Sequence, residues 1–200
     1  MTEYVSLYGK TKWSPSAYTS NTGLINHYIE PYLGKLKLSE VTSHTLEKYY
    51  QKLLTTPAVP AICVKKYTNE TRMVTTATIR KIHNVLRSAF TQAMKWDLID
   101  KNPAVYATVP KHECREREIW DAQTLFKAIE CCNDPRLKLC LNLAFSCTLR
   151  IGELLALTWD CVDISDESIQ AGNASISITK ELQRVSKQAM KALDDKDIIT

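Results

Sequence analysis

The stretch CTLRIGELLALTWDCVD, residues 147–163, places an arginine and a glutamate among leucines. Leu154 and Leu157 favour burial in a helix, whereas Arg150 and Glu153 are costly to desolvate unless they are paired or face a ligand. On a helix these two charged residues are neighbours at i,i+3, so the glutamate can hold the guanidinium at a fixed angle. A fixed planar fork of that kind suits bidentate binding of a phosphate. The spacing alone favours a simpler alternative, an ordinary salt bridge that ties a helix start to a loop.

The charge of the chain is uneven on the two sides of residue 110. Residues 1–110 carry 14 Lys and Arg against 7 Asp and Glu, whereas residues 111–200 carry 12 against 15. The asymmetry indicates two domains and favours a polyanionic partner for the first. A basic surface that is merely solvated is equally consistent with it.

The longest periodic segment is TTATIRKIHNVLRSAFTQAMKWDLI, residues 75–99. It predicts a helix whose apolar positions face a core, at Ile79, Ile82, Leu86, Ala89 and Ala93. Basic and short polar side chains occupy the rest of that helix, at Arg80, Lys81, His83, Asn84, Arg87, Thr91 and Lys95. Such a face suits a DNA backbone, because cations neutralise phosphates and neutral donors add hydrogen bonds. Many charged helix faces are nevertheless only solvated.

The other segments predict a mainly helical chain. In the first half we expect a loop and then a helix that begins at Ser20 or Asn21 and ends between Pro31 and Gly34. A second helix begins at Thr42 or Ser43, and its apolar stripe comprises Leu46, Tyr49, Tyr50 and Leu53. Residues 55–73 predict a loop, linker or short hairpin.

In the second half, Asp121 is expected to begin a helix that turns Leu125, Phe126 and Ile129 inward. Residues 136–147 are apolar almost all round and predict the core helix of the second domain. A turn then leads to a strand in which Ile176 and Ile178 alternate with polar residues. Such a strand needs a pairing partner, and we expect this partner to lie outside the chain.

Neither a transmembrane helix nor a signal peptide is visible, so a cytoplasmic protein is expected. The cysteines are odd in number and form no CxxC pair, so we interpret them as reduced, small core residues rather than metal or disulfide ligands. They are Cys63, Cys114, Cys131, Cys132, Cys140, Cys147 and Cys161.

The segment LRIGELLALTWDCVD resembles the first-arginine motif of the tyrosine recombinases, the phage-integrase family. Leu149, Arg150, Gly152, Glu153, Leu154, Leu157, Trp159, Val162 and Asp163 match the family pattern. Thr148 stands where the family usually has glycine, and Cys161 stands where aspartate is common. Residues 9–50 and 78–104 resemble the helical core-binding domain of integrases from conjugative transposons and related phages.

The resemblance implies a mainly α fold with three parts. Residues 1–108 would form a helical SAM-like core-binding domain that clamps DNA, and residues 109–118 a linker. Residues 119–200 would form the mostly helical N-terminal part of a mixed α+β catalytic domain with a short sheet.

The resemblance also implies the chemistry of the parent enzyme. A tyrosine attacks a DNA phosphodiester to form a 3′-phosphotyrosyl link, while two arginines stabilise the charge of the transition state and a hairpin lysine protonates the leaving oxygen. No metal or other cofactor is implied. Arg150 matches the first arginine and Glu153 the acid that supports it. Lys180 is one candidate for the lysine, and a residue beyond Thr200 is the other.

The chain lacks other parts of that machinery. No His-x-x-Arg follows residue 163, and the last tyrosine is Tyr106. We therefore expect an inactive fragment of a recombinase that binds double-stranded DNA. The parent would be tetrameric on DNA and the fragment monomeric, without a membrane or small-molecule partner. The alternatives are a non-catalytic DNA-binding regulator that occupies recombination sites and a helical interaction module with no DNA role.

Overall fold

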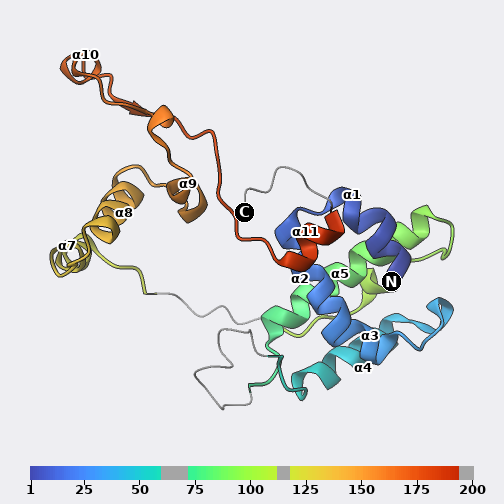
Figure 1. Ribbon diagram of the computed structural model, residues 1–200. Coiled ribbons are helices and arrows are strands. Elements are labelled where there is room, and N and C mark those ends of the chain that lie inside the picture. The colour runs from blue at the N-terminus through green and yellow to red at the C-terminus, as the bar shows by residue number, and fades with distance from the viewer. Residues whose placement is uncertain (60–71, 112–117, 194–200) are drawn as a thin grey trace. The chain divides into compact units, whose positions relative to one another are not determined.

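The computed structural model describes residues 1–59, 72–111 and 118–193 (Figure 1). The chain divides into two compact units. The first comprises Met1–Arg115 together with Val185–Thr200, and the second comprises Glu116–Arg184. Among the described helices, none is both long and apolar enough to span a membrane.

The first unit begins with two helical rods. The π-helical segment η1 (Tyr4–Gly9) continues into α1 (Lys10–Lys12), and α2 (Pro15–Leu24) continues through the π-helical segment η2 (Ile25–Ile29) into α3 (Glu30–Leu33). The second rod starts earlier than Ser20 or Asn21, so that expectation was wrong. Ser14 caps it by accepting the N–H of Ala17, and proline follows at the first helical position, which suits a helix start.

The π-helical turn η2 explains how this rod passes through Pro31. Within it the Glu30 N–H donates to the carbonyl of Ile25, five residues back. Proline has no N–H and its ring crowds the preceding turn, so a wider turn just before it limits the disruption. The rod then ends at Leu33, as the Pro31–Gly34 pattern predicts.

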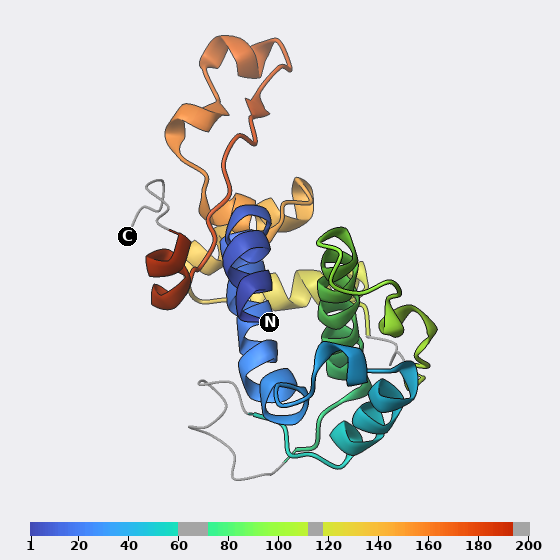
Figure 2. The same cartoon turned by 90° about the vertical axis from the view of Figure 1, so that its right-hand side faces the viewer.

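The remaining helices of the first unit follow the apolar periodicity closely. They are η3 (Leu38–Glu40), α4 (Ser43–Leu54), α5 (Thr76–Lys95) and α6 (Pro103–Tyr106). All nine apolar residues assigned to the two stripes of α4 and α5 are buried, and Thr42 and Thr75 cap these helices. Figure 2 shows α5, in green, lying alongside the blue N-terminal rods. The core forms where these rods, α4 and α5 pack together.

The loop between α4 and α5 is described only at its ends, which pair with each other. Pro57 and Met73 form an antiparallel bridge, and Ala58 donates its N–H to the carbonyl of Arg72 at 2.7 Å. The central part of the expected linker or hairpin, residues 60–71, lies outside the described residues.

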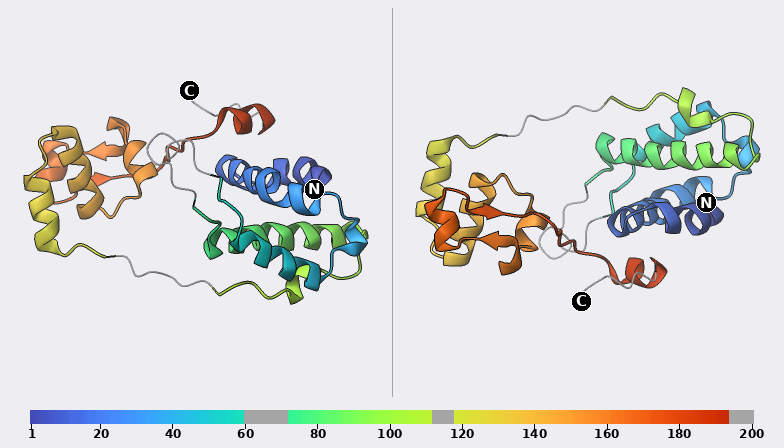
Figure 3. Two further views of the ribbon diagram at one scale, coloured as in Figure 1. Left: turned by 90° about the horizontal axis from the view of Figure 1, so that it is seen from below. Right: turned by 90° about the horizontal axis from the view of Figure 1, so that it is seen from above.

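The second unit contains α7 (Ala122–Glu130), α8 (Pro135–Ser146), α9 (Ile151–Leu155), η5 (Trp159–Cys161) and α10 (Asp166–Gln170). Its sheet consists of β1 (Val162–Asp163) and β2 (Ser175–Ile176), which pair antiparallel with Val162 opposite Ile176 (Figure 3). The strand around Ile176 therefore has a partner inside the chain, contrary to expectation.

Most apolar side chains of the second unit are uncovered. Phe126 is 64% exposed instead of pointing inward, and α8 contains no buried residue although its composition predicts a core helix. Among the described cysteines, Cys161 is buried as expected, whereas Cys131 and Cys147 are exposed. Cys63 and Cys114 lie outside the described residues. Burial requires a facing surface, and nothing in the described part of this unit covers these side chains.

The C-terminal helix α11 (Lys187–Leu193) belongs to the first unit and packs against α2. Ala189 is 1% exposed, and the hydroxyls of Thr19 and Ser186 lie 2.9 Å apart. The resemblance assigned all of residues 119–200 to the catalytic part, whereas α11 groups with the N-terminal helices.

Candidate functional site

The exposed face of α5 carries a row of cations and short polar side chains. Arg80, Asn84, Arg87, Thr91 and Lys95 recur at three- or four-residue steps and are all exposed, with Lys81 at the edge of the row. Among the described residues, none of the four cations in this set forms a salt bridge. The helix therefore presents uncompensated positive charge on the side opposite its buried stripe.

His83 does not belong to that exposed face, which corrects its assignment from sequence. It is 9% exposed, and its Nδ1 lies 3.0 Å from the hydroxyl of Tyr50 on α4. Burial lowers the pKa of His83, and the positive charges of Arg87 and Arg80 lower it further. His83 is thus a core residue directly behind the cationic row.

Asn102 fastens the C-terminal part of α5 to the start of α6. Its amide donates to the carbonyl of Arg87 and to the hydroxyl of Thr91, each at 2.9 Å, and its Oδ1 accepts the Ala104 N–H at 2.9 Å. The Thr91 hydroxyl itself donates to the Arg87 carbonyl. The Thr91 hydroxyl is therefore already hydrogen-bonded within the fold, and the other side chains of the row are more available to a ligand.

Arg150 and Glu153 form the predicted pair, although Arg150 lies just before α9 rather than within it. Arg150 has extended backbone angles at the N-cap position. One carboxylate oxygen of Glu153 accepts the backbone N–H of Arg150 and the other accepts the guanidinium, both at 2.9 Å. These bonds hold the pKa of Glu153 below its usual range, with the backbone bond contributing most. The side chain of Arg150 stays 87% exposed.

The backbone around Arg150 explains why Gly152 is a glycine and shows that Thr148 adopts a strained conformation. A Cβ on Gly152 would lie 2.9 Å from Cγ of Glu181 and 3.0 Å from the carbonyl of Leu182, so glycine allows that segment to pass closely. Thr148 has a φ of 52°, in the left-handed region that disfavours a β-branched residue. Glycine, the usual family residue at this position, would adopt that angle without strain.

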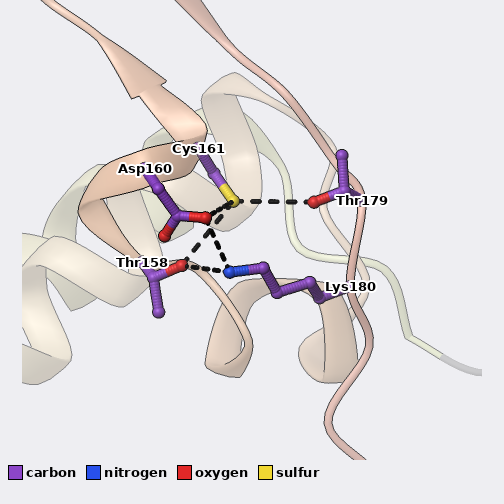
Figure 4. Close-up of polar contacts among 5 residues, drawn as sticks. All are labelled: Thr158, Asp160, Cys161, Thr179 and Lys180. Carbon is purple, nitrogen blue, oxygen red and sulfur yellow. Dashed lines mark hydrogen bonds and ion pairs between the residues drawn. The ribbon is translucent and has the colours of Figure 1, made fainter.

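Lys180 lies in a small polar cluster at the turn that follows α9 (Figure 4). Its Nζ donates to Oγ1 of Thr158 at 2.7 Å and to Oδ2 of Asp160 at 2.8 Å. The bond from Lys180, and after it the Thr158 side chain, lower the pKa of Asp160 to about 2, and the carboxylate in turn raises the pKa of Lys180. The Leu182 N–H donates to the Gly152 carbonyl at 2.9 Å, so the segment carrying Lys180 runs beside the start of α9, where Arg150 lies.

Cys161 is the buried member of the same cluster. Its sulfur lies 3.6 Å from the Thr179 hydroxyl and 3.7 Å from that of Thr158, and these bonds lower the pKa of the thiol. Asp160 was not among the residues singled out from sequence. The sequence did carry a signal for it. Cys161 stands where the family usually has aspartate, and Asp160 lies one position earlier.

Comparisons with known proteins agree with this architecture. Residues 1–54 match the family described as phage integrase, N-terminal SAM-like domain. An integrase of Saccharopolyspora erythraea is 27% identical over 165 residues, which are 82% of this chain and 32% of that protein. A XerC-like tyrosine recombinase of Caldanaerobacter subterraneus subsp. tengcongensis is 26% identical over 163 residues, 78% of this chain and 38% of that protein. The chain thus spans about a third of the length of these relatives.

Two solved structures share the fold. A lambda integrase dimer bound to a COC′ core site has a TM-score of 0.61 and 19% identity, covering 82% of this chain and 42% of that one. The Tn1549 transposon integrase in complex with circular intermediate DNA has a TM-score of 0.61 and 15% identity, covering 96% of this chain and 61% of that one.

The helical first unit and the small two-stranded second unit define a mainly helical protein with the fold of the N-terminal part of tyrosine recombinases. The sequence matches agree with this assignment. The N-terminal part of the chain and its sequence relatives are thus similar to the tyrosine recombinase, or phage integrase, family.

Proposed function

We propose that this chain is the DNA-binding N-terminal part of a site-specific tyrosine recombinase. Residues 1–108 act as the core-binding domain, residues 109–118 as a linker, and the catalytic part begins at residue 119. The exposed row on α5 carries this proposal, because Arg80, Lys81, Arg87 and Lys95 present positive charge without a salt-bridge partner among the described residues. Double-stranded DNA is the polyanion that such a face suits.

Arg150 acts as the first phosphate-binding arginine of the parent enzyme. Its guanidinium is exposed, and Glu153 fixes one edge of it, so the remaining donors are oriented toward solvent. Donors held in place before the reaction stabilise the charge that develops on a phosphate in the transition state. Lys180 is less suited to act as the proton donor, because its ammonium is held by Asp160 and Thr158. The alternative lysine beyond residue 200 is therefore favoured.

DNA binding through α5 is tested with a fluorescent duplex at several salt concentrations. Replacing both Arg80 and Arg87 by alanine should weaken binding and reduce the slope of log K against log salt by about 2, since each lost phosphate contact removes about one unit. The matched control replaces the exposed Lys127 and Lys138 of the second unit by alanine. Equal losses in both double variants, or no loss in either, would contradict a specific role for α5.

We further propose that the chain alone does not cleave DNA. No tyrosine follows Tyr106, so the distal nucleophile of the family is absent from these residues. Incubation with nicked attachment-site DNA, followed by denaturing electrophoresis, should show no covalent protein–DNA adduct. An adduct would refute this part of the proposal. DNA binding without cleavage would leave open a second role, in which the chain occupies recombination sites as a regulator.

A further inference from the structure

A hollow of about 300 Å³ lies between the N-terminal segment η1 and the C-terminal half of α5. Tyr8 lines it from η1, and Asn84, Arg87, Gln92 and Lys95 line it from α5. The hollow thus brings an aromatic hydroxyl and two amides beside two cations of the DNA-facing row.

The hollow offers donors and no acidic group. None of its lining residues is Asp or Glu. The side chains of Tyr8, Asn84, Arg87, Gln92 and Lys95 form no hydrogen bond or ion pair with the described residues. A concave site with several uncommitted N–H and O–H donors and two positive charges suits an anion with several acceptor oxygens.

Tyr8 is held in place by packing against its neighbours. Its ring stacks on that of Tyr4, with centroids 5.2 Å apart and an interplanar angle of 12°. Tyr4 is buried, and its hydroxyl donates to Oγ of Ser88 on α5 at 2.7 Å. Because Tyr4 is fixed to α5, the ring stacked on it has a defined position at the hollow, and its hydroxyl needs little ordering when a ligand binds.

We propose that this hollow binds one backbone phosphate of DNA, with Tyr8 as a neutral ligand contributed by the N-terminal segment. Arg87 and Lys95 neutralise the phosphate, and the Tyr8 hydroxyl and the two amides donate to its oxygens. The inference rests on the proposed DNA-binding function and extends the interface from α5 to η1. Because the Tyr8 hydroxyl is uncharged, its contribution to DNA affinity can be measured separately from that of the cations.

The decisive variant is Tyr8→Phe, which keeps the ring stacked on Tyr4 and removes only the hydroxyl. Affinity for a 30-base-pair duplex, measured by fluorescence anisotropy, should fall about fivefold, as expected for one lost hydrogen bond. The salt slope should not change, because no charge is lost. Arg87→Gln should lower both the affinity and the slope, the latter by about 1. Tyr106→Phe, at a tyrosine that is exposed and does not line the hollow, is the matched control.

The outcomes separate this inference from the function on which it rests. If Arg87→Gln weakens binding and Tyr8→Phe equals the wild type, the phosphate site is refuted and DNA binding by α5 stands. If neither variant affects binding, both proposals fail. Thermal unfolding in inorganic phosphate, compared with chloride at equal ionic strength, tests whether the hollow binds free phosphate rather than DNA. Stabilisation by phosphate that Tyr8→Phe abolishes, with DNA affinity unchanged, would assign the hollow to free phosphate and overturn its assignment to DNA.

Discussion

The Tyr50 hydroxyl and the Nδ1 of His83 lie 3.0 Å apart beneath the row of cations on α5. This contact links α4 to α5 inside the core of the first unit, and the tautomer of the imidazole decides which of the two groups donates. Burial and the nearby positive charges of Arg87 and Arg80 favour the neutral imidazole by lowering the pKa of His83.

The first unit should lose stability as His83 becomes protonated. The pKa of His83 is lowered in the folded chain, so below the unfolded-state value of about 6.5 the unfolded chain binds a proton that the folded chain resists. Stability should therefore fall between pH 7.5 and 5.5 in urea unfolding experiments. His83→Gln can still form a hydrogen bond with Tyr50 and should flatten that slope, and the exposed His44→Gln is the control. Identical slopes in all three proteins would contradict this prediction.

Asn102 should matter for stability more than an exposed asparagine does. Asn102→Ala removes two donated bonds and one accepted bond at a buried site, which should cost about 2 kcal/mol in the free energy of unfolding. Asn102→Asp keeps the acceptor for the Ala104 N–H but loses both donors. The exposed Asn26→Ala serves as the control in the same urea titration. A cost below 0.5 kcal/mol for Asn102→Ala, on the order of an ordinary surface change, would show that solvent replaces these bonds.

Thr148→Gly should stabilise the second unit. A β-branched residue at a φ of 52° is strained, and glycine relieves a cost of about 1 kcal/mol, less its greater freedom in the unfolded chain. Gly172, at a φ of 71°, provides the reverse test, since Gly172→Ala places a Cβ in open space and changes only the backbone preference. Thermal unfolding should show opposite shifts for the two variants, and a lower melting temperature for Thr148→Gly would count against strain at that position.

The ion pair of Asp160 with Lys180 should be visible in the titration of the lysine. Asp160→Asn removes the carboxylate that raises the pKa of Lys180, so this pKa should fall toward its ordinary value near 10.5. NMR of the lysine side chains measures the change, and Asp163→Asn is the control, because Asp163 contacts Ser165 and Ser168 instead. In the wild type the pair should persist above pH 4 and break as the pH falls toward 2, the pKa of Asp160 being about 2. An unchanged Lys180 titration would exclude the contact in solution.

The sequence pattern predicted the features that depend only on residues close together in the chain. The stripes of α4 and α5 follow the helical period, and Arg150 with Glu153 is a contact between residues three apart, so each could be read from neighbouring positions. The start of α2 could not, because its residues are mostly polar and half-exposed and carry no apolar stripe.

Contacts between distant residues explain the other differences. His83 lies close to the boundary between the two faces of α5, and its contact with Tyr50 on another helix could not be inferred from neighbouring positions. The partner of Lys180 is 20 residues away, across a hairpin whose register was unknown. The apolar composition of α8 indicates that it favours burial, but composition does not reveal whether a covering surface is present.

The packing of α11 on α2 has a consequence for the order in which the molecule is assembled during synthesis. The contact between Thr19 and Ser186 joins positions 167 residues apart. Because translation adds roughly 5–20 residues per second, the N-terminal rods are made well before the segment that covers them. During that interval the surface of α2 is accessible to chaperones or to another nascent chain. The packing of α11 on this surface is therefore a late step of folding.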